Sequence, residues 1–366
     1  MKKETRDYTA CASLFGLGKI PALGILFLAC AFPFLPVGGA AGVARSGQQP
    51  QEQQPSLNQR PTISVRSELV VVPVTVKDGR GNLIGDLRQN EFRILEDGVE
   101  QRVTLFSTET YPLSAVVLLD DDLKTKASEQ VQKSLVAMAG GFSAMDEAAV
   151  GRFDAFYTPV LDFSRDNDQL IDEFKRLDLN SSAPGVGSTV MTEGPTINGA
   201  AAPGAPSVAQ KNVGRDTTKH INDAVHAAAE LLRDRGRDRR KVIILVSDGV
   251  NAKNNTYSYE ETLKLLLSID VSVYAIGVDA AVLNRGTSVL SHYAHATGGD
   301  VYYSARGSSL PELYSHVSEQ ARHQYTLGYT PSGTDRTQDY HSIEVRIRRP
   351  ELTLLTRDGY YQIPRP

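Results

Sequence analysis

The sequence has no tryptophan, and its only two cysteines, Cys11 and Cys30, lie within the first thirty residues. The rest of the chain therefore has neither a disulfide framework nor a cysteine-based zinc site. A surplus of positive charge is also missing: the net charge is −4, which argues against a nucleic acid as partner. Of the 366 residues, 41% are hydrophobic and 22% charged, a globular balance that excludes a wholly disordered or multi-span membrane protein. At roughly 100–200 residues per domain, this length predicts two folded units plus tails.

The first 44 residues have the layout of an export signal. Residues 1–19 carry a net positive charge, and Ile20 to Ala44 is an uncharged stretch that is apolar at first and ends in small residues. This order is typical of a secretory signal peptide. The stretch is also long enough to span a bilayer as a helix, although its prolines disfavour a stable anchor. Residues 1–44 are therefore predicted to be a signal peptide or an N-terminal anchor. The protein is expected to be secreted or periplasmic, with membrane contact only through an uncleaved anchor.

Two segments have compositions that do not suit a packed core. Residues 45–62 are rich in Gln, Ser and Pro and are predicted to be a disordered linker. Residues 181–215 are dominated by Gly, Ala, Pro and Ser. A loop of this length without regular structure is uncommon unless it is functional or disordered. We therefore expect a flexible insert, with a partner-dependent lid as the alternative.

Residues 63–110 and 324–366 have the pattern of β-strands. Alternating, β-branched runs are separated by turn residues such as those of the Asp78–Asn82 cluster. Each segment alone makes only a marginal sheet, so the two are predicted to pack into one small β-sandwich. The expected strands are Leu69–Val76, Phe92–Glu96, Arg102–Phe106, Gln324–Tyr329, His341–Ile347 and Thr353–Thr356.

Residues 111–323 alternate between continuous apolar runs and amphipathic helical patterns. The strongest apolar runs are Ala115–Leu119, Lys241–Ser247 and Val271–Val278. Such runs are typical of strands buried on both faces, because the connecting helices cover a parallel sheet from both sides. This region is therefore predicted to be an α/β domain with a doubly wound, mostly parallel sheet.

Acidic residues follow two of these apolar runs. Asp120, Asp121 and Asp122 end the first run, and Asp248 ends the central one. Since the carboxyl ends of the strands form the ligand crevice of an open α/β sheet, we expect these carboxylates to converge. Like charges at close range need a cation, a proton or an ammonium group beside them. Their oxygen atoms suit Mg²⁺, Ca²⁺ or Mn²⁺. The alternative is that they only cap the helices and turns that follow.

The motif Ile243–Val250, with its Asp-Gly pair, and the strand Val271–Val278 carry a family resemblance. Together with Leu95–Gln101 and Tyr325–Tyr329, they are similar to the von Willebrand factor A domain family, in particular to the VWFA-related proteins of acidobacteria. The resemblance covers roughly residues 65–362. It implies a six-stranded, doubly wound sheet and a metal-ion-dependent adhesion site. That site is made of an Asp-x-Ser-x-Ser motif, a Thr and an Asp followed by Gly.

The first motif departs from this pattern. Asp120 is retained, but Asp122 and Lys124 stand where the family has its two serines, and Thr218 and Asp248 stand for the later Thr and Asp. The resemblance implies a degenerate site in which Asp120, Asp122, Thr218 and Asp248 hold Mg²⁺, Ca²⁺ or Mn²⁺. Alternatively, the Lys124 ammonium takes the place of the ion and neutralises Asp120 and Asp248. Four residues around it are expected to contact a ligand: Asp121, Lys124, Thr217 and Gly249.

Two functions are compatible with these residues. The resemblance favours an exported, non-enzymatic module for protein binding or adhesion, whose partner is a protein and not a nucleic acid. A hydrophobic strand followed by Asp-x-Asp also resembles the haloacid-dehalogenase phosphatases. In that alternative Asp120 is the nucleophile, Asp122 a general acid, Ser247 the second-motif hydroxyl and Mg²⁺ the cofactor. However, no later Asp-Asp pair closes a strand of the α/β region, as that family requires.

Overall fold

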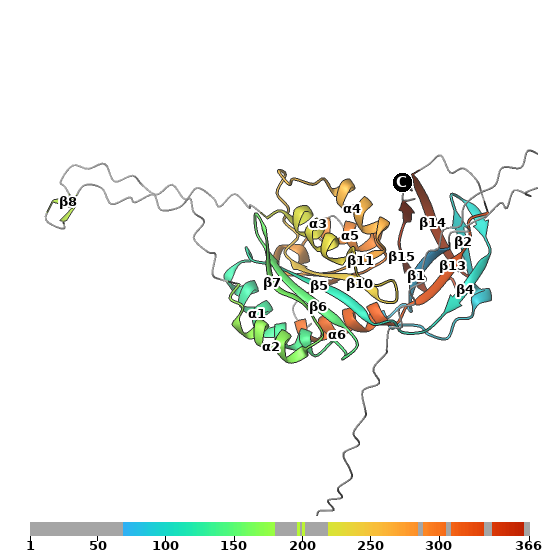
Figure 1. Ribbon diagram of the computed structural model, residues 1–366, viewed down its shortest axis with the longest axis horizontal. Coiled ribbons are helices and arrows are strands. Elements are labelled where there is room, and N and C mark those ends of the chain that lie inside the picture. Colours follow the sequence, from blue (N-terminus) through green and yellow to red (C-terminus); the bar gives the residue numbers. More distant parts are fainter. Residues whose placement is uncertain are drawn as a thin grey trace, which may run out of the picture. The chain divides into compact units, whose positions relative to one another are not determined.

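The computed structural model describes the folded part of the chain within residues 64–366 (Figure 1). The predicted signal or anchor at 1–44, the linker at 45–62 and Thr217 and Thr218 lie outside the described residues. Of the insert at 181–215, only the short strand pair β8 (Thr196–Ile197) and β9 (Ala200–Ala201) is described. No helix in the described part of the chain is both long and apolar enough to cross a membrane. The other described residues are 69–179, 219–284, 288–304, 309–332 and 339–361.

A mixed sheet of six strands forms the centre of the α/β domain. Its order is β12-β11-β10-β5-β6-β7, and every neighbouring pair is parallel except β6 with β7. All eight residues of β5 are buried, as expected for a strand covered on both faces. The predicted doubly wound, mostly parallel sheet is thus confirmed. The strands are β5 (Leu113–Asp120), β6 (Glu147–Phe153), β7 (Tyr157–Ser164), β10 (Arg240–Ser247), β11 (Val271–Gly277) and β12 (Val301–Tyr303).

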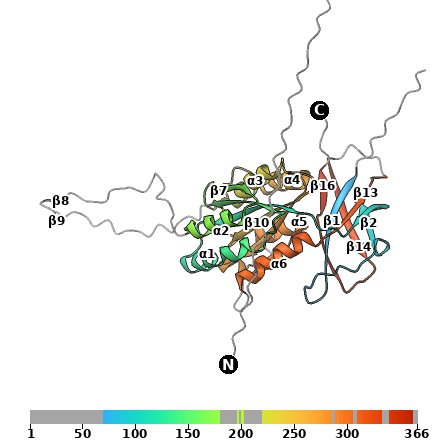
Figure 2. The same cartoon turned by 60° about the horizontal axis from the view of Figure 1, so that its bottom comes forward.

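Helices cover both faces of this sheet (Figures 1 and 2). On one face, α1 (Thr125–Ala139), α2 (Asn167–Arg176) and α6 (Leu310–Arg322) contribute Leu135, Phe174 and Val317 to an apolar core. The other face packs Val225, Leu266 and Tyr293 from three further helices. These are α3 (Ile221–Leu232), α4 (Tyr259–Ser268) and α5 (Val289–Ala296), with the short 3₁₀ turn η2 (Asp279–Val282) between the last two.

The edge strand β7 was not expected from the sequence. It contains Pro159 and Asp162, and its residues are half-buried or exposed, so the apolar run that marks the other strands is missing. Proline is tolerated there because an edge strand has one side without ladder hydrogen bonds. β7 runs antiparallel to β6 and closes the sheet on that side.

The two predicted β segments do form one sandwich, made of two four-stranded antiparallel sheets. Their orders are β15-β1-β13-β4 and β16-β14-β2-β3. Val72, Val74, Ile94, Leu327 and Val345 pack in its shared core. The strands are β1 (Val70–Lys77), β2 (Phe92–Glu96), β3 (Val99–Gln101), β4 (Val103–Ser107), β13 (Tyr325–Tyr329), β14 (Tyr340–Ile347), β15 (Thr353–Thr356) and β16 (Gly359–Tyr361), with the short 3₁₀ turn η1 (Gln89–Glu91) before β2.

The pairing inside the sandwich joins strands from the two ends of the folded chain. β1 pairs with β13 and β15, and β2 pairs with β14, so most partners come from the other end of the chain. Among the described strands of the sandwich, only β2 and β3 form a local hairpin, through Asp97 and Gly98, which both have positive φ (49° and 82°). An Asp-Gly pair suits such a tight turn, since both residue types adopt the left-handed conformation.

Arg240 joins the α/β domain to the sandwich. It begins β10, and its guanidinium donates to Gln324 Oε1 at 2.7 Å, to the Gln324 carbonyl at 3.1 Å and to Thr326 Oγ1 at 3.2 Å. Gln324 is buried and in turn donates to Thr75 Oγ1 and Tyr274 Oη. Arg357 makes a second link, since it pairs with Asp270 and donates to the Val71 carbonyl at 2.6 Å. The contacts of Arg240 fix the start of β10, the strand that carries half of the site described next.

We expect Arg240→Met to lower the free energy of unfolding by roughly 2–4 kcal/mol. The substitution removes three hydrogen bonds from a charged donor and leaves buried acceptors on Gln324 without a partner. Urea denaturation measures the change. The matched control is Arg237→Met, because Arg237 is exposed and its loss should change stability by no more than about 0.5 kcal/mol. Equal effects of the two variants would contradict the role given to Arg240.

Candidate functional site at the strand ends

Asp120 and Ser247 are the last residues of the neighbouring parallel strands β5 and β10. The register therefore brings them together, and Ser247 Oγ donates to Asp120 Oδ2 at 2.7 Å. The backbone N–H of Asp122 donates to the other oxygen, Oδ1, at 3.0 Å. Asp120 is 1% exposed and the following Asp248 is 7% exposed, so the structure brings two buried carboxylates to one place. A neutralising group is required there.

The ammonium group of Lys219 supplies that charge. Its Nζ lies 2.8 Å from Asp248 Oδ2 and 3.3 Å from Asp120 Oδ2, and the residue is 1% exposed. Its backbone is fixed as well, because the Lys219 carbonyl accepts the N–H of Ala252 at 2.8 Å. We call Asp120, Lys219, Ser247 and Asp248 the strand-end centre.

The start of α3 holds Lys219 in place. The helix has no side-chain cap of its own. Instead, Asn251 and Asn255, from the loop after β10, accept the N–H groups of Ile221 (2.9 Å) and Asn222 (3.0 Å). In return, Asp223 on α3 accepts the N–H of Tyr257 at 2.8 Å. The loop that follows Asp248 and the helix that follows Lys219 thus satisfy each other's free backbone groups, and this couples the two charged residues.

The structure corrects the expectation that Lys124 neutralises this pair. Lys124 precedes α1, its side chain is 75% exposed, and its Nζ pairs with Asp279 at 2.9 Å. Asp248 contributes to raising the pKa of Lys124, but less than Asp279 does through its hydrogen bond and its charge. An internal ammonium is present, as the charge argument required, but it comes from Lys219.

Three other predicted residues, Asp121, Asp122 and Gly249, adjoin the strand-end centre in the chain. Asp121 pairs with Arg152 at 3.3 Å, and burial raises the pKa of Asp121 to about 6 although Arg152 lowers it. Asp122 contacts Asp120 through its backbone. Gly249 has φ of +75° and donates its N–H to Ser247 Oγ at 3.1 Å. A side chain there would be strained by the backbone conformation and would press on Ser288 and Leu290.

The strand-end centre does not fit a divalent ion while Lys219 is charged. Asp120 Oδ1 accepts a backbone N–H, and Asp120 Oδ2 is shared by Ser247 and Lys219. Asp248 accepts from Lys219 and from the Val250 N–H. The oxygens that an ion needs are thus engaged by protein donors, and an ion among them would lie beside an ammonium group.

The sequence held a signal for Lys219 that a search restricted to motif positions misses. The lysine stands directly before an amphipathic helix and directly after Thr218, the residue expected to complete the site. The resemblance directs attention to positions within the Asp120–Lys124 motif. A wider search for any cation near the strand ends includes Lys219.

We expect Lys219→Met to lower the free energy of unfolding by ~3–5 kcal/mol, because it leaves two buried carboxylates without a counter-charge. Adding Mg²⁺ or Mn²⁺ should then raise the Tm of the variant but not that of the parent, since an ion can occupy the vacated place. Differential scanning fluorimetry measures both effects. Lys124→Met is the matched control, because an exposed ion pair contributes little. A parent that responds to Mg²⁺ as strongly as the variant would refute the role of Lys219.

The strand-end centre also predicts a pH dependence. Burial raises the pKa of Asp120 from 3.8 to about 6, although Lys219 and Ser247 lower it. Between pH 3.8 and about 6, the folded state therefore holds a proton on Asp120 that the unfolded state has already released. The stability contributed by this group is present below pH 3.8 and is lost as the pH rises through about 6. About two pKa units correspond to about 3 kcal/mol. As the pH rises from 4 to 6, the free energy of unfolding of Asp120→Asn should rise by about 3 kcal/mol relative to that of the parent, as measured by urea denaturation. The control variant Asp172→Asn changes an exposed residue and should have the same pH profile as the parent.

Comparisons with known proteins give matches among solved structures and to one protein family. No relative is found among curated proteins. The conserved hypothetical protein BatB from Bacteroides thetaiotaomicron is 12% identical over 57% of this chain and 98% of its own, with a TM-score of 0.39. A von Willebrand factor type A protein from Catenulispora acidiphila is 10% identical over 70% of this chain and 50% of its own, with a TM-score of 0.38. Manganese-loaded TRAP from Plasmodium vivax is 10% identical over 74% of this chain and 100% of its own, with a TM-score of 0.39.

The match to a protein family is more specific. The family model of the von Willebrand factor type A domain matches residues 207–316. This range includes α3, β10, β11 and α5, together with Lys219, Ser247 and Asp248 of the strand-end centre. Residues 207–316 therefore match the von Willebrand factor type A domain.

Proposed function

We propose that this protein is an exported, non-enzymatic module that binds another protein at the carboxyl ends of its six-stranded sheet, and that it binds without a divalent ion. Von Willebrand factor type A domains are generally non-catalytic interaction modules, which supports the kind of function. The export rests on the signal predicted for residues 1–44.

Two exposed apolar side chains at the strand ends carry the proposal. Phe156, in the turn between β6 and β7, is 77% exposed, and Leu283, after η2, is 88% exposed. The β6–β7 turn adjoins the strand-end centre, because the Asp154 carbonyl accepts the N–H of His220 at 2.9 Å. Large apolar groups held in water at the same edge of a sheet are typical anchors for a protein partner.

Charged groups accompany these anchors. The exposed Lys124–Asp279 pair lies between α1 and the start of η2, the turn that precedes Leu283. A polar border around apolar anchors is the usual composition of a protein interface. We call Lys124, Phe156, Asp279 and Leu283 the strand-end face.

Independence from metal follows from the strand-end centre. Lys219 holds the positive charge that an ion would bring, and it is covered by protein. A partner therefore binds the strand-end face without needing an ion to complete the charge of the strand-end centre. Removal of free divalent ions should leave the structure of the strand-end face unchanged.

The phosphatase alternative requires an accessible Asp120. Asp120 is 1% exposed, and both of its oxygens accept hydrogen bonds. A nucleophilic carboxylate needs a free oxygen directed at phosphorus, so this geometry disfavours the reaction. Release of phosphate from an aryl phosphate by the parent but not by Asp120→Asn would favour an enzyme over a binding module.

The binding proposal is tested by comparing variants at the two opposite edges of the six-stranded sheet. The parent, immobilised, is exposed to an extract of cell-envelope proteins, and the retained proteins are quantified by mass spectrometry with and without EDTA. Phe156→Asp and Leu283→Asp should each reduce retention of a specific partner at least tenfold, because a charge replaces an apolar anchor. EDTA should have no effect on the parent.

The matched control is Met145→Asp. Met145 is 66% exposed and precedes β6, at the opposite edge of the sheet. The Met145→Asp variant should retain the partner as the parent does. Equal loss with Met145→Asp, or loss of binding in EDTA, would contradict the proposed surface or its independence from metal.

A further inference from the structure

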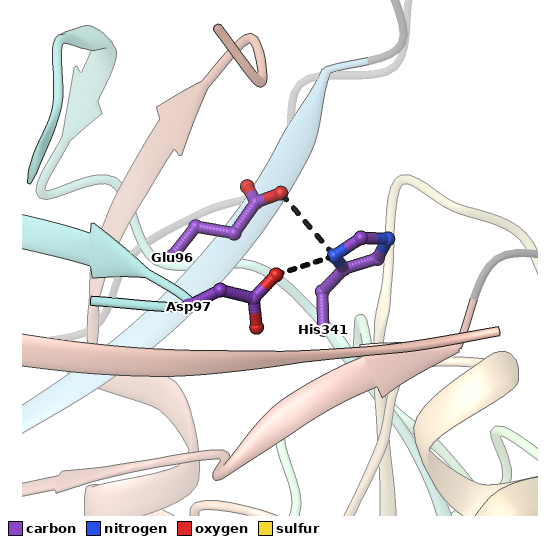
Figure 3. A group of neighbouring side chains, drawn as sticks. All are labelled: Glu96, Asp97 and His341. Carbon is purple, nitrogen blue, oxygen red and sulfur yellow. Dashed lines mark hydrogen bonds and ion pairs between the residues drawn. The ribbon is translucent and has the colours of Figure 1, made fainter. Parts of the chain in front are cut away.

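A second group of ionisable side chains lies in the sandwich and shares no residue with the strand-end centre (Figure 3). Glu96 is the last residue of β2, Asp97 follows in the tight turn to β3, and His341 lies on β14. Each offers one ligand atom, and these three atoms lie within 4.8 Å of one another. We call Glu96, Asp97 and His341 the sandwich triad.

The three donor atoms are already close to the spacing of a metal site. His341 Nδ1 lies 2.7 Å from Asp97 Oδ2 and 3.7 Å from Glu96 Oε1, and Figure 3 shows both carboxylates reaching toward the imidazole. A tetrahedral ion with bonds of roughly 2.0–2.2 Å holds its ligand atoms ~3.3–3.6 Å apart. His341 Nδ1 is thus about 0.6 Å closer to Asp97 Oδ2 than this range and about 0.1 Å farther from Glu96 Oε1.

The buried carboxylate of Glu96 is incompletely satisfied. Glu96 is 7% exposed, and its Oε2 is without a well-formed hydrogen bond among the described residues. The buried Tyr329 hydroxyl is nearby, since burial and then Glu96 raise the pKa of Tyr329. Tyr360 Oη donates to its other oxygen at 3.3 Å, which is a long contact. Within the described ranges no lysine or arginine forms an ion pair with Glu96 or Asp97, and the imidazole of His341 is the side chain that both carboxylates approach. A buried carboxylate in this state costs free energy that a bound cation would offset.

The backbone around the sandwich triad orients its ligands. Asp97 has a positive φ, and its Oδ1 accepts the N–H and the hydroxyl of Ser342 at 2.9 and 3.1 Å. These bonds leave Oδ2 directed at His341. Supporting contacts of this kind fix the orientation of metal ligands. The Asp97 side chain is 42% exposed, which provides an entry path and room for a water as fourth ligand.

We propose that Glu96, Asp97 and His341 form a Zn²⁺ site with three protein ligands and an open fourth position. One imidazole and two carboxylates suit Zn²⁺, whereas Mg²⁺ and Ca²⁺ prefer oxygen atoms alone. The ion would connect the β2–β3 turn to β14, two segments from opposite ends of the folded chain. This site is separate from the strand-end centre and does not depend on the function proposed above.

The test uses the full chain after chelator treatment, with Zn²⁺ alone as the probe. Competition with a chromophoric chelator should show one bound Zn²⁺ per chain, and Zn²⁺ should raise the Tm because it binds the folded state. Equal concentrations of Mg²⁺ or Ca²⁺ should not raise it. Absence of stoichiometric Zn²⁺ binding would overturn the proposal.

Variants identify the ligands. His341→Gln should weaken Zn²⁺ binding at least tenfold. Asp97→Asn should also weaken it at least tenfold, while keeping an acceptor for Ser342 and tolerating the positive φ. It therefore serves as the test should His341→Gln fail to fold. His316→Gln is the matched control, since His316 is exposed and lies on α6. Zn²⁺ affinity equal to the parent's in Asp97→Asn, or an equal loss in His316→Gln, would overturn the assignment.

Discussion

The α/β domain depends on one buried ammonium group. Parallel strands bring Asp120 and Asp248 together at the carboxyl edge of the sheet, and both carboxylates are buried. Lys219 compensates both at 2.8 and 3.3 Å. The desolvation cost of such a group is high, so its value lies less in net stability than in fixing one arrangement. The loop after β10 and the start of α3 adopt their mutual geometry around it.

Much of the fold could be predicted because its signals are local. Continuous apolar runs identified β5, β10 and β11, and alternation identified the strands of the sandwich other than the three-residue β3 and β16. β7 lacked either signal because an edge strand needs neither full burial nor freedom from proline. The pairing of β1 with β13 and β15 also could not be read from the sequence, since strand patterns specify faces but not neighbours.

The site was predictable in its charges but not in its geometry. The requirement for a compensating cation followed from Asp120 and Asp248 alone. The choice between Lys124 and Lys219 depends on where a loop and a helix start lie in space, which spacing does not specify. The sandwich triad shows the same limit: Asp97 and His341 are separated by 244 residues, and a β-hairpin turn and one strand register bring them to 2.7 Å.

The interleaving of the sandwich has a consequence for how the chain folds. Both neighbours of β1 lie beyond α6, so β1 has no partner until the last part of the chain has been synthesised. The α/β domain lies between β1 and β13 in the chain, has its own core and can fold before β1 is paired. The pairing of β1 closes a loop as long as this domain, which slows the final step. In a chain that stopped after α6, both edges of β1 would be unpaired, and such an exposed strand is a template for aggregation. Completion of the sandwich therefore marks a chain that has been synthesised through its C-terminal strands.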